Sequence, residues 1–329
     1  MIQKNNCAVI LAAGEGKRMQ SKLPKVLCPV LFKPMVDWVI DAAAQAVEEI
    51  CLVVGHGGDQ VRAHTAGRCR CVEQKERLGT GHAVMQAADF LRSHADGHTL
   101  VLCGDAPLMD GETLAAALAF HKQADNAVTV ISARLEDPAS YGRIIRDEAG
   151  RLAAIVEYKD ADANQRAVKE INSGAYWFRT NDLLEVLPRL QNNNAQGEYY
   201  LTDAVSLLLQ RGAAAGAFAA ENPDVVLGAN NRADLLQLNE KARMQVINRL
   251  LAAGVDIPCA DGLLIGPDVT VGRDTCILPA TVLCGRTVVG EGCRLGPALR
   301  LEDCRVSDGR VLSCCDRTGE VIQREGKPL

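Results

Sequence analysis

The stretch VILAAGEGKRMQSKLPKVL, residues 9–27, begins as a short apolar strand and continues directly into a loop rich in glycine and basic residues. Gly14 and Gly16 let the backbone approach a ligand closely, so that amide groups can point at phosphate oxygens. Arg18 and Lys25 add fixed positive charge beside those amides. The pattern favours a phosphate-binding loop after a buried strand. For this loop taken alone, the alternative is a tight turn with solvated basic side chains.

The loop matches neither of two well-known phosphate-binding glycine patterns. It lacks the G-x-x-x-x-G-K-[ST] spacing of the P-loop ATPases, and it lacks the third glycine of the dinucleotide fingerprint. The ligand class therefore has to be inferred from the rest of the chain.

Apolar runs rich in branched residues alternate with helical patterns over the first part of the chain. The expected strands are CAVILAA at 7–13, EICLVVG at 49–55, TLVLCGD at 99–105 and NAVTVIS at 126–132. The expected helices, in which apolar residues recur at intervals of three and four, lie at 35–47, 79–91 and 111–123. This alternation predicts an α/β fold with a Rossmann-like, doubly wound, mostly parallel sheet covered on both faces. Such sheets bind ligands at the carboxyl ends of their strands, where the glycine loop and Asp105 both fall.

Composition restricts the class of protein. The chain has 329 residues, enough for about two domains, with 48% apolar residues and a formal net charge of −5. The negative charge argues against a partner that is nucleic acid or a membrane surface, and no apolar run reaches the roughly 18 residues of a membrane span. The short N-terminal apolar run leads into a glycine loop instead of a cleavage site, so we expect no signal peptide and a cytoplasmic protein.

The 13 cysteines have no C-x-x-C spacing, which favours free thiols buried as small hydrophobes over a metal site.

The C-terminal part has a different period. Apolar residues recur every six positions without a gap, at Ile265, Val271, Ile277, Leu283, Val289, Leu295 and Leu301. A six-residue repeat predicts a parallel β-helix with three short strands per coil, and 265–301 covers about two coils. Beyond residue 301 the apolar residues no longer recur every six positions and the sequence is polar, so an irregular tail is expected there. Residues 235–254 have the pattern of a linking helix.

Seven further segments follow the glycine loop in a fixed order: EQKERLGTGHAV at 73–84, CGDAPLM at 103–109, YGRIIRD at 141–147, IVEYKDA at 155–161, EINSGAY at 170–176, NNNAQGEYYLTD at 192–203 and GANNRADL at 228–235. Together with the glycine loop, they resemble the sugar-phosphate nucleotidyltransferases, and within them the uridylyltransferase half of the bifunctional bacterial N-acetylglucosamine-1-phosphate uridylyltransferases/glucosamine-1-phosphate acetyltransferases. The resemblance covers about residues 5–255. It implies a nucleotidyltransferase domain at 1–232 with the nucleotide-diphospho-sugar transferase fold and a linking helix at 233–254. A short left-handed β-helix of hexapeptide repeats with its tail would fill 255–329.

The resemblance also implies an activity and a set of site residues. The expected reaction joins UTP and N-acetylglucosamine 1-phosphate to give UDP-N-acetylglucosamine and pyrophosphate, with Mg²⁺ as cofactor. The catalytic residues would be Arg18 and Lys25, and the metal ligands would be Asp105 and Asn230. The nucleotide would contact Leu11, Ala13, Gly14, Gln74, Gly79 and Thr80, and the sugar phosphate would contact Gly142, Glu157, Asn172, Tyr200 and Thr202.

The chemistry of this reaction suits what the sequence contains. A sugar-phosphate oxygen is already anionic at pH 7, so it needs no general base, and the sequence shows no pattern of a catalytic triad. The protein has to hold two polyanions in line and stabilise charge on the α-phosphorus. One carboxylate and one amide oxygen, with phosphates and waters, are enough for Mg²⁺.

Two positions depart from the family pattern. Lys17 stands where the family usually has threonine, and an extra cation beside the phosphates should be tolerated. Cys103 stands where an aromatic residue is common, and only a change in packing is expected.

Two other functions stay open from the sequence. One is a nucleotidyltransferase for another sugar 1-phosphate or nucleoside triphosphate, and the other is a non-catalytic regulatory protein that binds nucleotide-sugar. The joint presence of Arg18, Lys25, Asp105 and Asn230 argues against the second.

The β-helix of the resembled family forms trimers and carries acetyltransferase activity, which uses a histidine base. A homotrimer through the β-helix is therefore an option for this chain. No histidine follows His121, so we expect no acetyltransferase activity.

Overall fold

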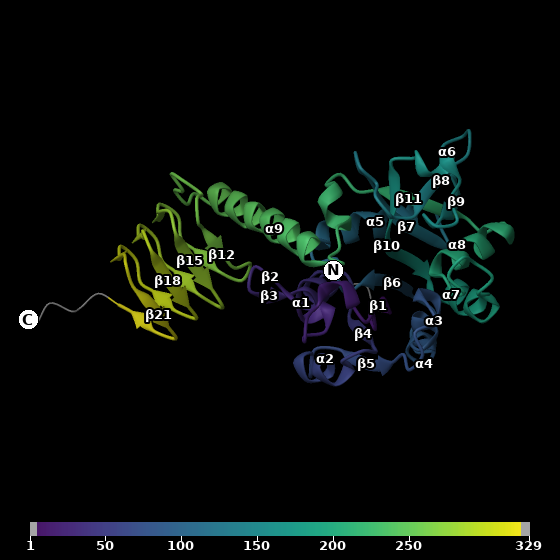
Figure 1. The fold of residues 1–329 in the computed structure, drawn as a ribbon, viewed down its shortest axis with the longest axis horizontal. Helices are drawn as coiled ribbons and strands as arrows, with labels where there is room; N and C mark the ends of the chain where they lie inside the picture. The colour runs from purple at the N-terminus through teal and green to yellow at the C-terminus, as the bar shows by residue number, and fades with distance from the viewer. Residues whose placement is uncertain (1–4, 324–329) are drawn as a thin grey trace, which may run out of the picture. The chain divides into compact units, whose positions relative to one another are not determined.

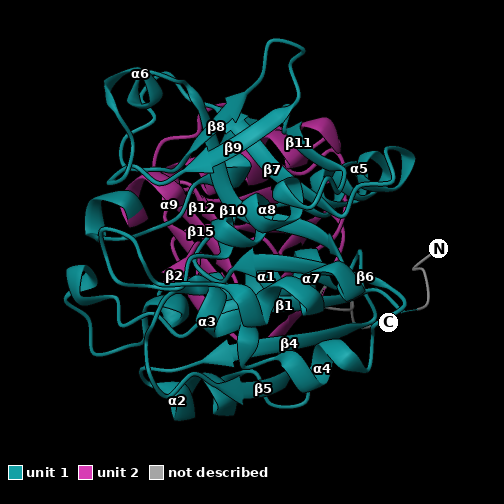
Figure 2. Cartoon of the chain, turned by 90° about the vertical axis from the view of Figure 1, so that its right-hand side faces the viewer, with its two compact units in different colours: residues 1–28, 34–234 teal, residues 29–33, 235–329 magenta. Residues whose placement is uncertain are grey.

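The computed structural model describes residues 5–323 and has two compact units. Unit 1 comprises residues 1–28 and 34–234, and unit 2 comprises residues 29–33 and 235–329 (Figure 2). The short segment 29–33 groups with unit 2 because its polar groups bind there. The Leu31 amide donates to Asn239 Oδ1 at 2.9 Å, and Lys33 Nζ lies 2.8 Å from Asp268 Oδ1.

Unit 1 is built on a mixed, mostly parallel sheet with the strand order β11-β7-β10-β6-β1-β4-β5 (Figure 1). In chain order these strands are β1 (Cys7–Ala12), β4 (Glu49–Val54), β5 (Arg70–Glu73), β6 (His98–Cys103), β7 (Val128–Arg134), β10 (Glu170–Arg179) and β11 (Ala215–Ala219). Strand β10 runs antiparallel to both β6 and β7, and the other neighbours along this order pair in parallel. Two further strands, β8 (Arg143–Arg146) and β9 (Leu152–Val156), attach through β10.

Both faces of this sheet are covered, because alternate residues of β1 enter two separate cores. Cys7 and Val9 pack in one core and Ala8 and Ile10 in the other, all fully buried. The first core includes α3 (Thr80–Met85), α4 (Ala88–Arg92), α7 (Thr180–Val186) and α8 (Leu201–Gln210). The second includes α1 (Met35–Ala43), α2 (Gly58–His64) and α5 (Gly111–Gln123). The doubly wound α/β fold predicted from the alternating pattern is confirmed.

Short elements complete unit 1. They are α6 (Ala163–Arg166) and the 3₁₀ turns η1 (Lys17–Met19), η2 (Lys25–Leu27), η3 (Leu187–Arg189) and η4 (Pro223–Val226). The stretch 79–91, expected as one helix, forms α3 and α4 instead. The break lies at Ala87, whose backbone leaves the helical region at φ −91° and ψ 11°.

Unit 2 contains most of the long helix α9 (Arg232–Ala252) and three stacks of short parallel strands (Figure 1). The stacks have the orders β12-β15-β18-β21, β13-β16-β19-β22 and β14-β17-β20. The strands of the first stack are Leu264–Ile265, Thr281–Cys284, Leu299–Glu302 and Asp316–Thr318. Those of the second are Thr270–Val271, Val288–Val289, Arg305–Val306 and Val321–Ile322, and those of the third are Cys276–Ile277, Arg294–Leu295 and Val311–Leu312. This is the short β-helix predicted from the six-residue period. The remaining short strands, β2 (Pro29–Val30) and β3 (Lys33–Pro34), pair with each other.

The irregular tail expected after residue 301 is wrong for residues 302–322. Leu283 pairs with Leu301, 18 positions on, whereas Val289 pairs with Val306, 17 positions on, and Val306 pairs with Ile322, 16 positions on. Each coil therefore loses a residue at a corner while its strands stay paired. A fixed step of six misses these coils, and residues 324–329 of the predicted tail lie outside the described residues.

All 13 cysteines are free. Six of them are buried, as expected of thiols used as small hydrophobes, but Cys314 is exposed. Over residues 5–323, helices of the length and apolar character needed to cross a bilayer are absent.

Candidate functional site

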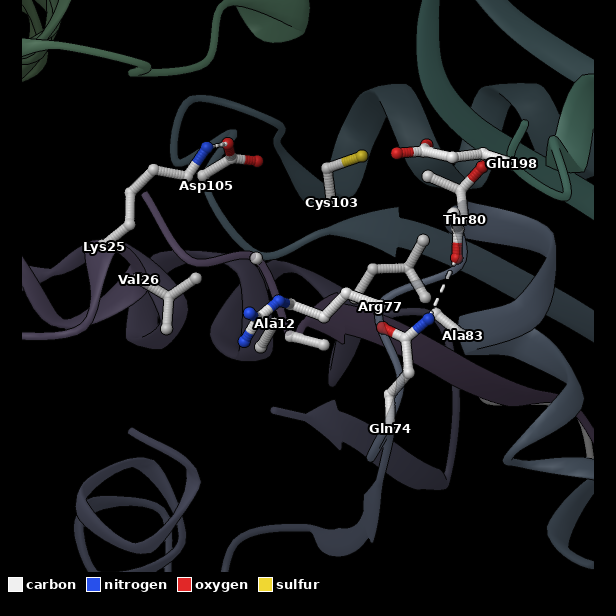
Figure 3. Close-up of a pocket in the computed structure, with 14 residues that line it drawn as sticks. Ala12, Lys25, Val26, Gln74, Arg77, Thr80, Ala83, Cys103, Asp105 and Glu198 are labelled. Atoms are coloured by element: carbon white, nitrogen blue, oxygen red, sulfur yellow. Dashed lines mark hydrogen bonds and ion pairs between the residues drawn. The ribbon is translucent and has the colours of Figure 1, made fainter. Parts of the chain in front are cut away.

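A pocket of about 310 Å³ opens at the carboxyl ends of β1 and β6 in unit 1 (Figure 3). Eight of the residues predicted for the site line it: Leu11, Ala13, Gly14, Lys25, Gln74, Gly79, Thr80 and Asp105. The strand ends supply these residues because parallel strands direct their following loops to one edge of the sheet. In Figure 3, Lys25 and Asp105 lie together at one side of the pocket, and Gln74 and Thr80 lie at the other.

At one end of the pocket, Gln74 is held in a fixed orientation. Its side chain is buried, and Nε2 donates to the Gly79 carbonyl at 3.0 Å and lies 3.1 Å from His82 Nδ1. Thr80 Oγ1 accepts a hydrogen bond from the Leu201 amide at 3.0 Å, which ties the start of α3 to the start of α8. This end therefore presents fixed amide and carbonyl groups, and the side chain of Glu198 lies beside Thr80 (Figure 3).

The other end of the pocket is charged. Lys25 Nζ forms an ion pair with Asp105 and lies 3.4 Å from Asn230 Oδ1. The backbone of the glycine loop packs directly against the Lys25 side chain. A Cβ added at Gly16, whose φ is +63°, would lie only 2.7 Å from Lys25 Cβ, so this close approach requires glycine. The Ala229 amide donates to the Asp105 carbonyl at 3.2 Å, which brings the loop before α9 to the end of β6. Asn230 thus joins the charged end although it does not line the pocket.

Arg18 lies apart from these contacts. It belongs to η1 beside the glycine loop, and its side chain is exposed and makes no hydrogen bond or ion pair within residues 5–323. The sequence predicts Arg18 and Lys25 as partners, and the structure brings only Lys25 into the pocket wall.

A second group of predicted residues converges on the antiparallel part of the sheet. The Asn172 amide donates to the Gly142 carbonyl at 2.9 Å, and Thr202 Oγ1 lies 3.5 Å from Glu157 Oε1. A Cβ at Gly142 would lie 3.4 Å from Glu157 Oε2 and 3.5 Å from Asn172 Cβ, so glycine leaves room beside both side chains. Four of the five predicted sugar-phosphate residues therefore lie together.

The fifth, Tyr200, is buried at the start of α8, two residues before Thr202. Its hydroxyl accepts a hydrogen bond from Gln196 Nε2 at 2.7 Å. Burial is the main cause that raises the pKa of Tyr200 above its ordinary value, so the phenol stays protonated at neutral pH.

Burial also raises the pKa of Glu157, and the nearby carboxylates of Asp160 and Asp203 act in the same direction while the hydrogen bond from Thr202 opposes them. The side-chain amide of Asn172 has a fixed orientation beside Glu157, because its Nδ2 donates to the Tyr176 hydroxyl at 2.7 Å and its Oδ1 accepts from the Gly174 amide at 3.0 Å. A half-buried carboxylate beside an oriented amide is suited to bind a neutral polar group such as a sugar hydroxyl.

Cys103 lies between the pocket and this second group. Burial raises the pKa of its thiol to about 12, and the carboxylates of Asp105 and Glu157 act in the same direction. The thiol therefore stays protonated and is not a nucleophile at neutral pH. Its Sγ lies 3.7 Å from the Gly174 carbonyl, so its role is packing, as expected from the sequence.

Six lining residues are not predicted from the sequence: the apolar residues Ala12, Val26 and Ala83, the thiol of Cys103, and the charged residues Arg77 and Glu198. Arg77 and Glu198 stand inside quoted motifs, at 73–84 and 192–203, but no spacing rule marks one charged residue of such a segment as facing a cavity. Only the fold shows which of them do.

Asp105 and Asn230 fit the binding of a divalent cation. Their oxygens converge on one cationic nitrogen, Lys25 Nζ, and both are the oxygen donors that Mg²⁺ prefers. Among the described residues, no cluster of three or more histidine, cysteine, aspartate or glutamate side chains could hold a metal. A metal at this point would therefore need phosphate and water oxygens to complete its shell.

Known proteins match most of the chain. The sequence profile of the family described as Nucleotidyl transferase matches residues 7–225. Bifunctional protein GlmU of Geobacillus sp. (strain WCH70) is 44% identical over 306 residues, which are 93% of this chain and 66% of that protein. Bifunctional protein GlmU of Pelobacter propionicus is 42% identical over 323 residues, or 97% of this chain and 69% of that protein. The chain thus spans about two thirds of the length of these relatives.

Proposed function

The chain belongs to the nucleotidyl transferase family, and from this premise we propose that it is a UDP-N-acetylglucosamine diphosphorylase. It would transfer UMP from UTP to N-acetylglucosamine 1-phosphate and release pyrophosphate. The supporting observation is the pocket, which has fixed amide and carbonyl groups at one end, at Gln74 and Gly79, and the ion pair of Lys25 and Asp105 at the other. This arrangement suits a ligand with a neutral base and a polyanionic tail.

The end of the pocket at Gln74 would bind the uridine. Leu11, Ala13 and Gly14 offer main-chain groups at the end of β1, and Gly79 and Thr80 face them across the pocket. The contacts of Gln74 Nε2 to Gly79 and His82 fix the side-chain amide and leave its Oε1 as an acceptor of known orientation. An amide fixed in this way can discriminate uracil from cytosine, since the two differ in donor and acceptor positions.

The charged end would carry out the transfer. An oxygen of the sugar phosphate forms a bond to the α-phosphorus of UTP, the bond from that phosphorus to the bridging oxygen breaks, and pyrophosphate leaves. Lys25 and Arg18 would stabilise the negative charge that develops on the phosphoryl oxygens, and Asp105 and Asn230 would hold the metal. Bound Mg²⁺ would supply further charge neutralisation on the phosphates.

The second group of residues would bind the N-acetylglucosamine phosphate. Glu157 accepts hydrogen bonds from hydroxyl groups, Asn172 is fixed beside it, and Gly142 leaves space for the sugar. Tyr200 and Thr202 place hydroxyls at the start of α8. Polar groups that are buried and already oriented discriminate strongly against sugars that leave them unpaired.

The experiment that tests the proposal is pyrophosphate release by the purified chain. We expect release that requires divalent metal, prefers UTP over ATP, GTP, CTP and dTTP, and prefers N-acetylglucosamine 1-phosphate over glucose 1-phosphate. A preference for another triphosphate or sugar would replace this function by the first alternative given above. Tight binding of UDP-N-acetylglucosamine without any turnover would replace it by the regulatory one.

Three further expectations stay proposals. They are a cytoplasmic location, a homotrimer formed through unit 2, and the lack of acetyltransferase activity in this chain. Light scattering at micromolar concentration tests the trimer. Thiol release from acetyl-CoA with glucosamine 1-phosphate tests the acetyltransferase.

A further inference from the structure

A chain of ion pairs joins two loops at the pocket, and the function proposed above does not use it. Glu15 lies in the glycine loop, and its Oε2 is 3.3 Å from Lys17 Nζ in the same loop. The same oxygen is 3.3 Å from Arg77 Nη2, on the loop between β5 and α3. Arg77 lines the pocket and is one of the labelled side chains in Figure 3.

These contacts are weak enough to be exchanged. The side chains of Glu15, Arg77 and Lys17 are 31%, 49% and 78% exposed. Ion pairs at this exposure are held loosely, because water screens them and ordering two long side chains costs entropy. One carboxylate oxygen is also shared by two cations, so the group has an excess of positive charge.

We propose that Arg77 and Lys17 are additional phosphate-binding residues, and that Glu15 is a built-in competitor for them. When a polyanion binds in the pocket, Arg77 and Lys17 would form ion pairs with its phosphates and leave Glu15. The guanidinium of Arg77 has the geometry to donate two hydrogen bonds to one phosphate group, whereas its contact with Glu15 joins one nitrogen, Nη2, to one oxygen, Oε2. Glu15 therefore lowers the affinity for the triphosphate and, equally, for pyrophosphate.

The location supports a phosphate as the ligand instead of the base or the sugar. Glu15 stands between Gly14, which lines the pocket, and Gly16, which packs against Lys25. The carboxylate thus lies on the loop whose amides and neighbouring cation would receive phosphate oxygens. A negative charge at that point opposes phosphate binding, and it has no such effect on an uncharged uridine.

This inference rests on the proposed function, since it names further contacts of the same site. The test is equilibrium binding of uridine, UMP, UDP and UTP, each with Mg²⁺, to wild type, Glu15→Gln and Arg77→Gln. We expect Glu15→Gln to bind UTP about three-fold more tightly and Arg77→Gln to bind it about five-fold more weakly, with effects that grow with the number of phosphates. Uridine affinity should not change.

Neighbouring residues provide matched controls. Glu76→Gln and Lys75→Gln make the same charge changes on the loop that carries Arg77, and both side chains are exposed and outside the pocket lining. Neither should change the affinity for UTP by as much as two-fold, and this would exclude a general effect of net charge.

Each outcome decides the matter. Unchanged or weaker UTP binding by Glu15→Gln would overturn the proposal, because Glu15 would then be inert or would position Arg77. Inorganic tripolyphosphate provides an arm that does not depend on the nucleotide. If wild type fails to bind UTP but Glu15→Gln tightens tripolyphosphate binding, the proposed function fails and the phosphate contacts stand.

Discussion

In unit 2, the buried polar side chains of the described residues are Thr275, Thr281 and Thr287, which are six positions apart. In unit 1, buried polar side chains such as Gln74 and Thr202 lie around the candidate site. Both units bury polar atoms, and burial is costly unless the atoms are hydrogen-bonded. The threonines of unit 2 and Thr202 of unit 1 meet this requirement in different ways.

The threonines of unit 2 bind their own backbone. Thr281 Oγ1 donates to the Leu278 carbonyl and Thr287 Oγ1 to the Cys284 carbonyl, each at 2.7 Å. Thr202 Oγ1 reaches only a carboxylate oxygen, at 3.5 Å. The comparison indicates that the repeat uses these threonine hydroxyls for stability, whereas Thr202, beside the predicted sugar-phosphate residues, keeps a weakly bound hydroxyl that a ligand can use. The predictions below test this separation of stability from function.

The largest expected effect is on catalysis. Lys25→Ala should lower turnover about 100-fold to 1000-fold, because a lost electrostatic contact to developing charge costs about 3–4 kcal/mol of barrier. Stability should change little. Lys22→Ala is the control, since Lys22 is exposed on the same loop and does not line the pocket. Steady-state pyrophosphate release measures the effect, and a Lys25→Ala variant that keeps near wild-type turnover would remove Lys25 from the catalytic residues.

The features of the fold and the site that the sequence predicts are those that depend on residues close together along the chain. The strand-and-glycine pattern at 9–27 and the six-residue period both depend on neighbours along the chain, and both features are present in the structure. The coils after 301 were missed because corners shortened by one residue keep strand pairing and change the period. Arg77 was missed because its position in the pocket depends on the packing of separate loops.

The second expected effect is on the stability of unit 2. Leu283 is fully buried inside the coils, so Leu283→Ala should cost about 3 kcal/mol through lost apolar burial and a residual cavity. Turnover at low temperature should be unchanged. Both tryptophans, Trp38 and Trp177, lie in unit 1, so denaturation followed by their fluorescence should not shift.

The buried thiols of Cys284, Cys293 and Cys304 provide a matching probe for unit 2. Faster labelling of these thiols in Leu283→Ala, with unit 1 unaffected, is the expected result. A parallel shift of the tryptophan signal would instead show that the two units unfold together, and the comparison would fail.

The third effect is a pH dependence confined to unit 1. His121 Nε2 lies 3.1 Å from His98 Nδ1, and burial is the main cause that lowers the pKa of His98 to about 4 and of His121 to about 3. An unfolded histidine takes up a proton near pH 6.5. The unfolded state therefore binds more protons than the folded state between pH 6.5 and about 4, so stability falls as pH falls through this window.

Because His98 is only half-buried, we expect a loss of about 2 kcal/mol between pH 6.5 and pH 5, which is below the full linkage value. Tryptophan-detected denaturation across this range measures it, and His98→Gln should flatten the dependence. All six histidines lie in unit 1, so labelling of the unit 2 thiols should not show this histidine-dependent change. An equally steep dependence in His98→Gln would assign the effect to other groups.

The smallest effects come from a matched pair of threonines, one in each unit. Thr287→Val removes a hydroxyl that donates to the Cys284 carbonyl at 2.7 Å and accepts from the Cys304 amide at 3.3 Å. Two buried backbone groups lose a partner, so the free energy of unfolding of unit 2 should fall by about 1–2 kcal/mol, seen as faster labelling of Cys284 and Cys304, with turnover unchanged.

Thr202→Val should instead change activity and leave stability almost unchanged, because the Thr202 hydroxyl makes only one long contact to Glu157 within unit 1. We expect KM for the sugar phosphate to rise about five-fold, which is about 1 kcal/mol, with little change in tryptophan-detected stability. If Thr202→Val destabilised unit 1 as much as Thr287→Val destabilises unit 2, its hydroxyl would be a structural group, and the distinction between the two units would not hold at this position.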